Sequence, residues 1–334
     1  MALLVLVEWV PPSPGLSWLR HSPWDGIRVA DVVFPAFLFM VGAGMSLATG
    51  TRWRRLARRT VLLLVLGLLF NAWGDTGADL SDLRLPGVLQ MIAVAGLIAG
   101  AVTAFVRRAV IVAAIALGLV VLNGFLLSHA PLACGTGRLD PGCSFPWAAD
   151  RHVFGSGHVY HQGAFGHDPE GLLTTLLAAP ALVLVGWAAG RFLYTARDRV
   201  GTAVLAVAAL GSTGVAALIW SPNKRLWTPT FGLLMAAGCT LVLVALSFAL
   251  DRPARWPVQP VRWTLTALGR NALLVYIGQH VVAQALANTP SGNGTLQTAL
   301  LDHVGSLLGV ALLAVAVSAA IAAVLHALDW HWTV

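Results

Sequence analysis

The residues best suited to chemistry lie in the segment LRHSPWDGIRVADVVFPAFLFMVG, residues 19–42. His21, Asp25 and Asp31 precede or enter an almost wholly apolar run. A histidine can act as a general base near neutral pH, or can accept an acyl group on a ring nitrogen. A carboxylate commonly orients such a ring. We therefore predict that His21 is catalytic with Asp31 or Asp25 as partner, and favour Asp31 because a carboxylate in an apolar helix needs a partner or water.

The composition indicates an integral membrane protein. Of the 334 residues, 57% are hydrophobic and 10% are charged, against about 25% charged in soluble domains. Recurring apolar runs predict an all-α polytopic membrane helix bundle, and no long alternating pattern favours a barrel. We expect one transmembrane domain over 1–334 with about ten spans, the first being stunted or starting part-way: 2–12, 29–49, 57–74, 87–106, 109–128, 171–190, 201–220, 230–250, 264–287 and 304–328.

The distribution of basic residues predicts the orientation. Alternate connections between spans are richer in arginine, above all the stretch RWRRLARR at 52–59. By the positive-inside rule these connections face the cytoplasm, so both termini of this multi-pass cell-membrane protein are expected there too. The formal charge of +7 is explained in the same way, and we expect no nucleic-acid partner.

The segment 129–170 is longer than a simple connection between helices and is predicted to form an extracytoplasmic cap. A polar cap without chemistry and a substrate-binding surface both remain open. A metal site from His158, His161, His167 and Asp168 fits no zinc spacing well, so we expect no metal. Cys134 and Cys143 share this loop, and the oxidising outer face favours a disulfide between them.

Several stretches together resemble one family. They are the segment at 19–42, LRLPGVLQMIAV at 83–94, DRHVFGSGHVY at 150–160, DPEGLLTTLLAAPALVLVGWAAGRFL at 168–193, PNKRLWTPTFGLL at 222–234 and LGRNALLVYIG at 268–278. This set is similar to the heparan-α-glucosaminide N-acetyltransferase family of transmembrane acyltransferases. The resemblance implies acetyl-CoA as donor, a terminal glucosamine or related amino sugar as acceptor, and His21 as the catalytic residue. Two departures are that Glu8 stands where the family has an active-site asparagine, and that the family's D-x-x-RG stretch is absent.

The remaining site residues are predicted to bind substrate: Glu8, Trp24, Asp150, Arg151, His158, Asp168, Glu170, Asn223, Lys224, Trp227 and Asn271. Asn223 and Lys224 would supply donors to a developing oxyanion. Simpler interpretations exist for some of them. Trp24 and Trp227 suit an aromatic belt at the membrane boundary, and Asn271 suits a hydrogen bond between helices.

The sequence thus predicts transfer of an acetyl group from cytoplasmic acetyl-CoA to an amino sugar or glycan beyond the membrane. Two alternatives stay open. A transporter would also use intramembrane ionisable residues and prolines, although no inverted halves are visible, and a non-catalytic family member would explain Glu8. The lipid bilayer is an expected partner, and a homodimer is left open.

Overall fold

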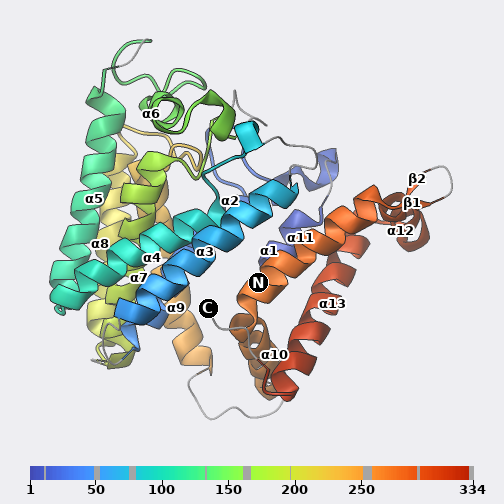
Figure 1. Ribbon diagram of the computed structural model, residues 1–334. Helices are drawn as coiled ribbons and strands as arrows, with labels where there is room; N and C mark the ends of the chain where they lie inside the picture. The colour runs from blue at the N-terminus through green and yellow to red at the C-terminus, as the bar shows by residue number, and fades with distance from the viewer. Residues whose placement is uncertain are drawn as a thin grey trace. The chain divides into compact units, whose positions relative to one another are not determined.

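The structure is a computed structural model that describes residues 1–10, 13–48, 53–74, 80–131, 134–160, 167–195, 197–250, 258–291 and 294–330. The described part of the chain is mostly helical (Figure 1). It divides into two compact units, which are described separately. The smaller unit holds 1–21, 28–34 and 246–333, and the larger holds 22–27 and 35–245.

Among the described residues, eight helices are long and apolar enough to cross a membrane. They are α2 (Val29–Ser46), α3 (Trp53–Gly74), α4 (Val88–Phe105), α5 (Ala109–His129), α7 (Ala179–Gly190) with its flanking π-helical turns η5 (Thr174–Ala178) and η6 (Arg191–Thr195), α8 (Arg199–Ala216), α9 (Pro229–Leu250) and α13 (Leu307–Ala327). The predicted all-α, polytopic membrane fold is confirmed.

Two of the ten expected spans differ from such a helix. The first is α1 (Ala2–Glu8), whose 7 residues are too few to cross a bilayer. The run 264–287 is divided at Asn271 into α10 (Val258–Arg270) and α11 (Ala272–Asn288). Asn271 leaves helical geometry at φ −106°, ψ 25°, and its side-chain Nδ2 donates to the carbonyl of Ala267 at 3.3 Å. The backbone N–H of Asn271 donates to the same carbonyl at 3.2 Å, so this helical hydrogen bond persists and the break is a change of backbone angles at Asn271.

In the larger unit, α7 is the most buried span, with 72% of its apolar window inside the protein. Its neighbours are α4 and α5, and glycines let α2 come close. A side chain at Gly42 would collide with the carbonyl of Val183, and one at Gly186 with that of Phe39. Small residues at these crossings let the helix backbones approach, as is common between membrane helices.

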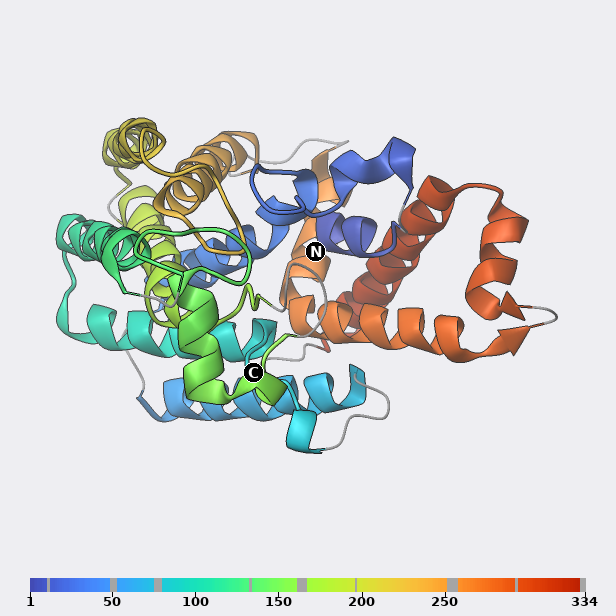
Figure 2. The same ribbon diagram turned by 90° about the horizontal axis from the view of Figure 1, so that it is seen from above.

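The smaller unit pairs α13 with both α1 and α10 (Figure 2). A short antiparallel hairpin of β1 (Pro290–Ser291) and β2 (Gly294–Thr295) follows α11 and leads into α12 (Leu296–Val304). The 3-10 helix η1 (Pro14–Leu19) also belongs to this unit and ends just before His21.

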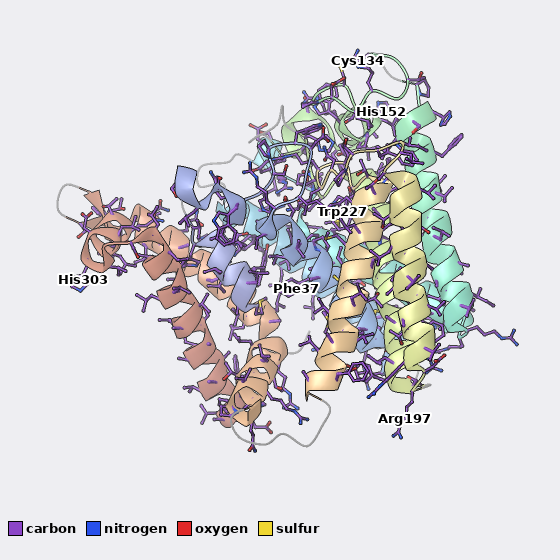
Figure 3. All side chains as sticks on the ribbon, turned by 180° about the vertical axis from the view of Figure 1, so that it is seen from behind. Phe37, Cys134, His152, Arg197, Trp227 and His303 are labelled. Carbon is purple, nitrogen blue, oxygen red and sulfur yellow. A yellow bond between two sulfur atoms is a disulfide. The ribbon has the colours of Figure 1, made fainter. Side chains whose placement is uncertain are left out.

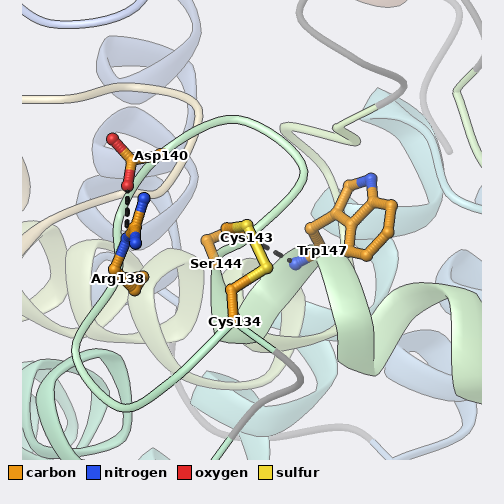
Figure 4. The surroundings of a disulfide bond; sticks show 6 residues. All are labelled: Cys134, Arg138, Asp140, Cys143, Ser144 and Trp147. Carbon is orange, nitrogen blue, oxygen red and sulfur yellow. Dashed lines mark hydrogen bonds and ion pairs between the residues drawn. A yellow bond between two sulfur atoms is a disulfide. The ribbon is translucent and has the colours of Figure 1, made fainter.

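The segment 129–170 carries regular structure of its own. It contains α6 (Phe145–Phe154) and the 3-10 turn η3 (Ser156–His158), and a further 3-10 turn, η2 (Leu80–Asp82), packs against η3. Cys134 and Cys143 form a disulfide with Cα atoms 5.5 Å apart (Figure 4). In the larger unit, Cys134 lies at one end of the long helices and Arg197 at the other (Figure 3).

Candidate active site

His21 and Asp31 form a hydrogen-bonded pair in the smaller unit. Nδ1 of His21 lies 2.8 Å from Oδ1 of Asp31, whose side chain is only 1% exposed, while the histidine side chain is 47% exposed. Asp31 sits in the first turn of α2, and its Oδ2 accepts the backbone N–H of Arg28 at 2.9 Å. A carboxylate in the first helical turn is stabilised by the helix dipole and by such a capping bond.

The chain before α2 is fixed by a second contact of Arg28. Its guanidinium donates to the carbonyl of Ser17 in η1 at 3.1 Å. The segment that carries His21 is thereby tied at both sides of the histidine. A ring that donates its Nδ1–H to a carboxylate has its lone pair on Nε2, which suits a general base or an acyl acceptor.

Glu8 and Trp9, at the end of α1, face α11 within the same unit. Trp9 Nε1 donates to Oε1 of Gln279 at 2.9 Å, and Nε2 of His280 lies 3.9 Å from Oε2 of Glu8. The Glu8 side chain remains 42% exposed. Gln279 and His280 were not predicted from the sequence. Two adjacent polar residues within an apolar run were the pattern that could have indicated them.

Asp25 is hydrogen-bonded to Asn223 within the larger unit. In the larger unit, Asn223 Nδ2 donates to Asp25 Oδ1 at 3.1 Å, and the backbone N–H of Gly26 donates to the carbonyl of Pro222 at 2.8 Å. Asn223 Oδ1 accepts the N–H of Leu226 at 3.0 Å. The short stretch 22–27 is therefore bound to the loop before α9 by these hydrogen bonds, which hold Asp25 beside Asn223.

The two tryptophans predicted to bind substrate lie in different settings. Trp227 is 1% exposed, its carbonyl accepts Asn123 Nδ2 at 2.9 Å, and it helps to line an apolar cavity of about 200 Å³ between α5, α7, α8 and α9 (Figure 3). The aromatic-belt interpretation is therefore wrong for Trp227. Trp24 donates from Nε1 to the carbonyl of Leu139 in the cap at 3.2 Å.

Lys224, the other residue predicted to donate to an oxyanion, lies in the loop before α9. Its backbone carbonyl accepts the N–H of Trp227 at 3.3 Å.

Arg84 joins two of the predicted cap residues into a buried ionic cluster. Its guanidinium donates to both carboxylate oxygens of Asp168, at 2.9 and 2.6 Å, and to Oε2 of Glu170 at 2.6 Å. The ring of Tyr160 stacks 4.7 Å from the guanidinium carbon. The two carboxylates raise the pKa of Arg84 in spite of its burial. Sequence analysis missed Arg84, whose signal was an arginine immediately ahead of an apolar run.

Asp150 and His167 are buried acid and base side chains beside this cluster. Asp150 is 1% exposed and its Oδ1 accepts the N–H of Leu172 at 2.6 Å. Burial raises the pKa of Asp150 to about 7, and the nearby Asp168 adds to the rise. His167 is fully buried with its ring edge-on to Trp24, and burial lowers the pKa of His167 to about 4.

We expect Asp150→Asn to remove a pH-dependent loss of stability. Because the folded-state pKa is about 7 and the ordinary value is 3.8, the folded protein holds a proton that the unfolded chain has lost between these pH values. The free energy of unfolding therefore falls as pH rises from about 4 to 7. Between pH 5 and 8, the free energy of unfolding of Asp150→Asn should rise relative to that of the wild type by on the order of a few kcal/mol. Thermal unfolding in detergent measures this difference. Asp140→Asn, at an exposed carboxylate, is the control, and equal pH profiles for all three proteins would contradict the prediction.

The other cap candidates make local contacts. His158 donates from Nδ1 to the carbonyl of Leu83 at 2.8 Å, and the guanidinium of Arg151 stacks 4.9 Å from the Trp147 ring. His161 lies outside the described residues. Within the described part of the chain, no group of three or more His, Cys, Asp and Glu side chains is placed to hold a metal ion. Asn271, buried at the break between α10 and α11, has no hydrogen-bond partner for Oδ1 among the described residues.

The fold and the site define a polytopic helical membrane protein with a histidine–carboxylate pair at the start of its second helix. Residues 17–141, which contain this pair, match the family described as heparan-alpha-glucosaminide N-acetyltransferase, catalytic. Heparan-alpha-glucosaminide N-acetyltransferases of Homo sapiens and Mus musculus are each 25% identical to the chain, over 83% and 84% of its length. The alignments cover 51% and 52% of those proteins, so the chain spans about half the length of the relatives that it matches. The predicted resemblance to this family is confirmed.

Proposed function

We propose that the protein is a transmembrane acetyltransferase that transfers an acetyl group from acetyl-CoA to an amino sugar on the opposite side of the membrane. The observation that carries the proposal is the His21–Asp31 pair, at 2.8 Å, inside the segment that matches the family. The names of the human and mouse relatives specify a glucosaminide as acceptor and acetyl as the group transferred, and we extend both to this chain.

His21 acts as proton acceptor or as acetyl carrier. In the first route, the sugar amine nitrogen bonds to the thioester carbonyl carbon while Nε2 of His21 takes a proton from that amine. The proton then passes to the departing CoA sulfur. In the second, Nε2 itself bonds to the carbonyl carbon and displaces CoA as a thiolate. The sugar amine then bonds to that carbon, the bond from Nε2 breaks, and the proton lost by the amine passes to solvent while the thiolate takes one up. In both routes positive charge develops on the ring, and the buried carboxylate of Asp31 stabilises it.

The proposed sidedness is tested by labelling engineered cysteines. We expect Arg55→Cys, at the exposed start of α3, to react with a membrane-impermeant maleimide only when the cytoplasmic face is open. Arg138→Cys, on the exposed cap, should react from outside in intact cells. The background is Cys239→Ser, which removes the free cysteine of the described chain. Labelling at position 55 from outside alone would overturn the orientation.

The proposed activity is tested with the purified protein in detergent. Incubation with labelled acetyl-CoA and glucosamine should yield N-acetylglucosamine and free CoA in equal amounts. The same preparation in liposomes should show no uptake of unmodified sugar. Uptake without acetylation would establish a transporter, whereas neither activity from a folded preparation, across a panel of amino sugars, would favour a non-catalytic protein.

A further inference from the structure

A second pocket lies in the larger unit, at the beginning of α5 and the end of the α7 span. It has a volume of about 660 Å³ and is lined by residues 107–111 together with Arg191, Phe192 and Thr195. Three arginines, Arg107, Arg108 and Arg191, line this pocket, which we call the arginine pocket. Its volume falls within the range typical of small-molecule sites.

Among the described residues, none of the three arginines of the arginine pocket forms an ion pair. The ion pairs between described residues use other cationic side chains. Asp198 lies close, since its backbone N–H donates to the carbonyl of Phe192, but its carboxylate caps α8 by accepting the N–H of Gly201 at 2.7 Å. Arg191 has its guanidinium carbon 5.7 Å from the Trp187 ring. The pocket therefore presents guanidinium groups without a paired anion.

The start of α5 adds to this positive charge. Arg108 is the N-cap residue, and no side chain caps the helix there. The N-terminus of a helix carries partial positive charge and outward-pointing N–H groups, so cationic side chains are unfavourable at this position and anions are favourable. An anion in the pocket would be attracted both by the arginines and by the start of α5.

We propose that the arginine pocket binds phosphate groups on the cytoplasmic side of the membrane. The positive-inside rule places this end of α5 in the cytoplasm, and guanidinium groups bind phosphate oxygens through charge-assisted hydrogen bonds. Two sources of phosphate reach this face, namely the phosphates of CoA and the headgroup of an anionic phospholipid. The CoA case rests on the proposed function, because it would hold the donor's phosphate end at the pocket.

The test compares the wild type with the triple variant Arg107→Gln/Arg108→Gln/Arg191→Gln. The matched control is Arg54→Gln/Arg55→Gln/Arg58→Gln, which removes the same charge from the exposed start of α3. CoA binding is measured by calorimetry in detergent, and phosphatidylglycerol binding in nanodiscs against phosphatidylcholine. The arginine-pocket variant should bind one of the two ligands at least about tenfold more weakly, while the control changes by less than about threefold. Size-exclusion profile and melting temperature verify that both variants are folded.

The outcomes separate the pocket from the proposed function. A loss confined to CoA identifies the CoA phosphates as the ligand, and a loss confined to phosphatidylglycerol identifies a lipid headgroup. If the wild type binds phosphatidylglycerol through these arginines but does not bind CoA, the pocket stands and the proposed donor fails. If the folded triple variant binds both ligands as tightly as the control does, the pocket proposal is overturned and the acetyltransferase proposal is unaffected.

Discussion

Replacement of His21 by alanine should abolish acetyl transfer and leave the protein folded. The ring is 47% exposed and supports little packing, so the melting temperature should change little. If His21 is the general base, its loss should lower kcat by about 10²–10⁴-fold. If it carries the acetyl group, the loss should be at least as large, because the route itself disappears. The measurement is acetylation of glucosamine by purified, folded protein.

Two further variants separate catalysis from general damage. Asp31→Asn keeps the side-chain shape but removes the charge that stabilises a protonated ring, so it should lower kcat more than it raises KM. His303→Ala removes a histidine at an exposed position of α12 (Figure 3) and should leave activity unchanged. His21→Ala with most of the wild-type turnover would exclude His21 as base or carrier.

Loss of Arg84 should produce the largest effect on stability. Arg84→Ala leaves the side chains of Asp168 and Glu170, which are 0% and 8% exposed, without their cation. Removing one partner of a buried ion pair typically costs about 3–5 kcal/mol, because the remaining charge stays buried and uncompensated. The free energy of unfolding in detergent, obtained from urea or thermal denaturation, should fall by that amount.

The control for this prediction lies in the cap. Arg138 and Asp140 form an ion pair of similar length, 2.7 Å, but the two side chains are 54% and 59% exposed. Because surface ion pairs contribute about 0–1 kcal/mol, Arg138→Ala should change stability little. A loss for Arg84→Ala no larger than that for Arg138→Ala would contradict the prediction that burial makes the Arg84 cluster the stronger contributor to stability. Additional replacement of Asp168 by asparagine and Glu170 by glutamine should recover part of the loss from Arg84→Ala.

The long apolar runs sufficed to predict the membrane helices, because hydropathy over about 20 residues directly reflects the thickness of the bilayer. Hydropathy did not reveal the break at Asn271, because a single polar residue hardly changes the mean hydropathy of a span. The break is a change in the backbone angles of Asn271, which hydropathy does not report. The helix within the cap was likewise missed, because the segment that contains α6 was treated only as a long polar loop.

The site was predictable only where its residues are close in sequence. His21 and Asp31 are ten residues apart, and a carboxylate entering an apolar helix calls for a partner. The choice between Asp31 and Asp25 nevertheless depends on the partners that the fold supplies, and Asp25 is held by Asn223, 198 residues away. Arg84 is 84 residues from Asp168, so neither residue alone indicated the ion pair. Burial of Trp227 is similarly a property of the packed bundle.

The most direct test of the account is acetyl transfer across a membrane. The purified protein is reconstituted into liposomes whose orientation is known from cysteine labelling, with glucosamine on the face of the cap and labelled acetyl-CoA on the face of the arginine-rich connections. We predict that labelled N-acetylglucosamine accumulates on the glucosamine side, that CoA is released on the other side, and that His21→Ala abolishes both. Product that forms only when both substrates share one side, or forms equally with His21→Ala, would contradict transmembrane transfer through His21.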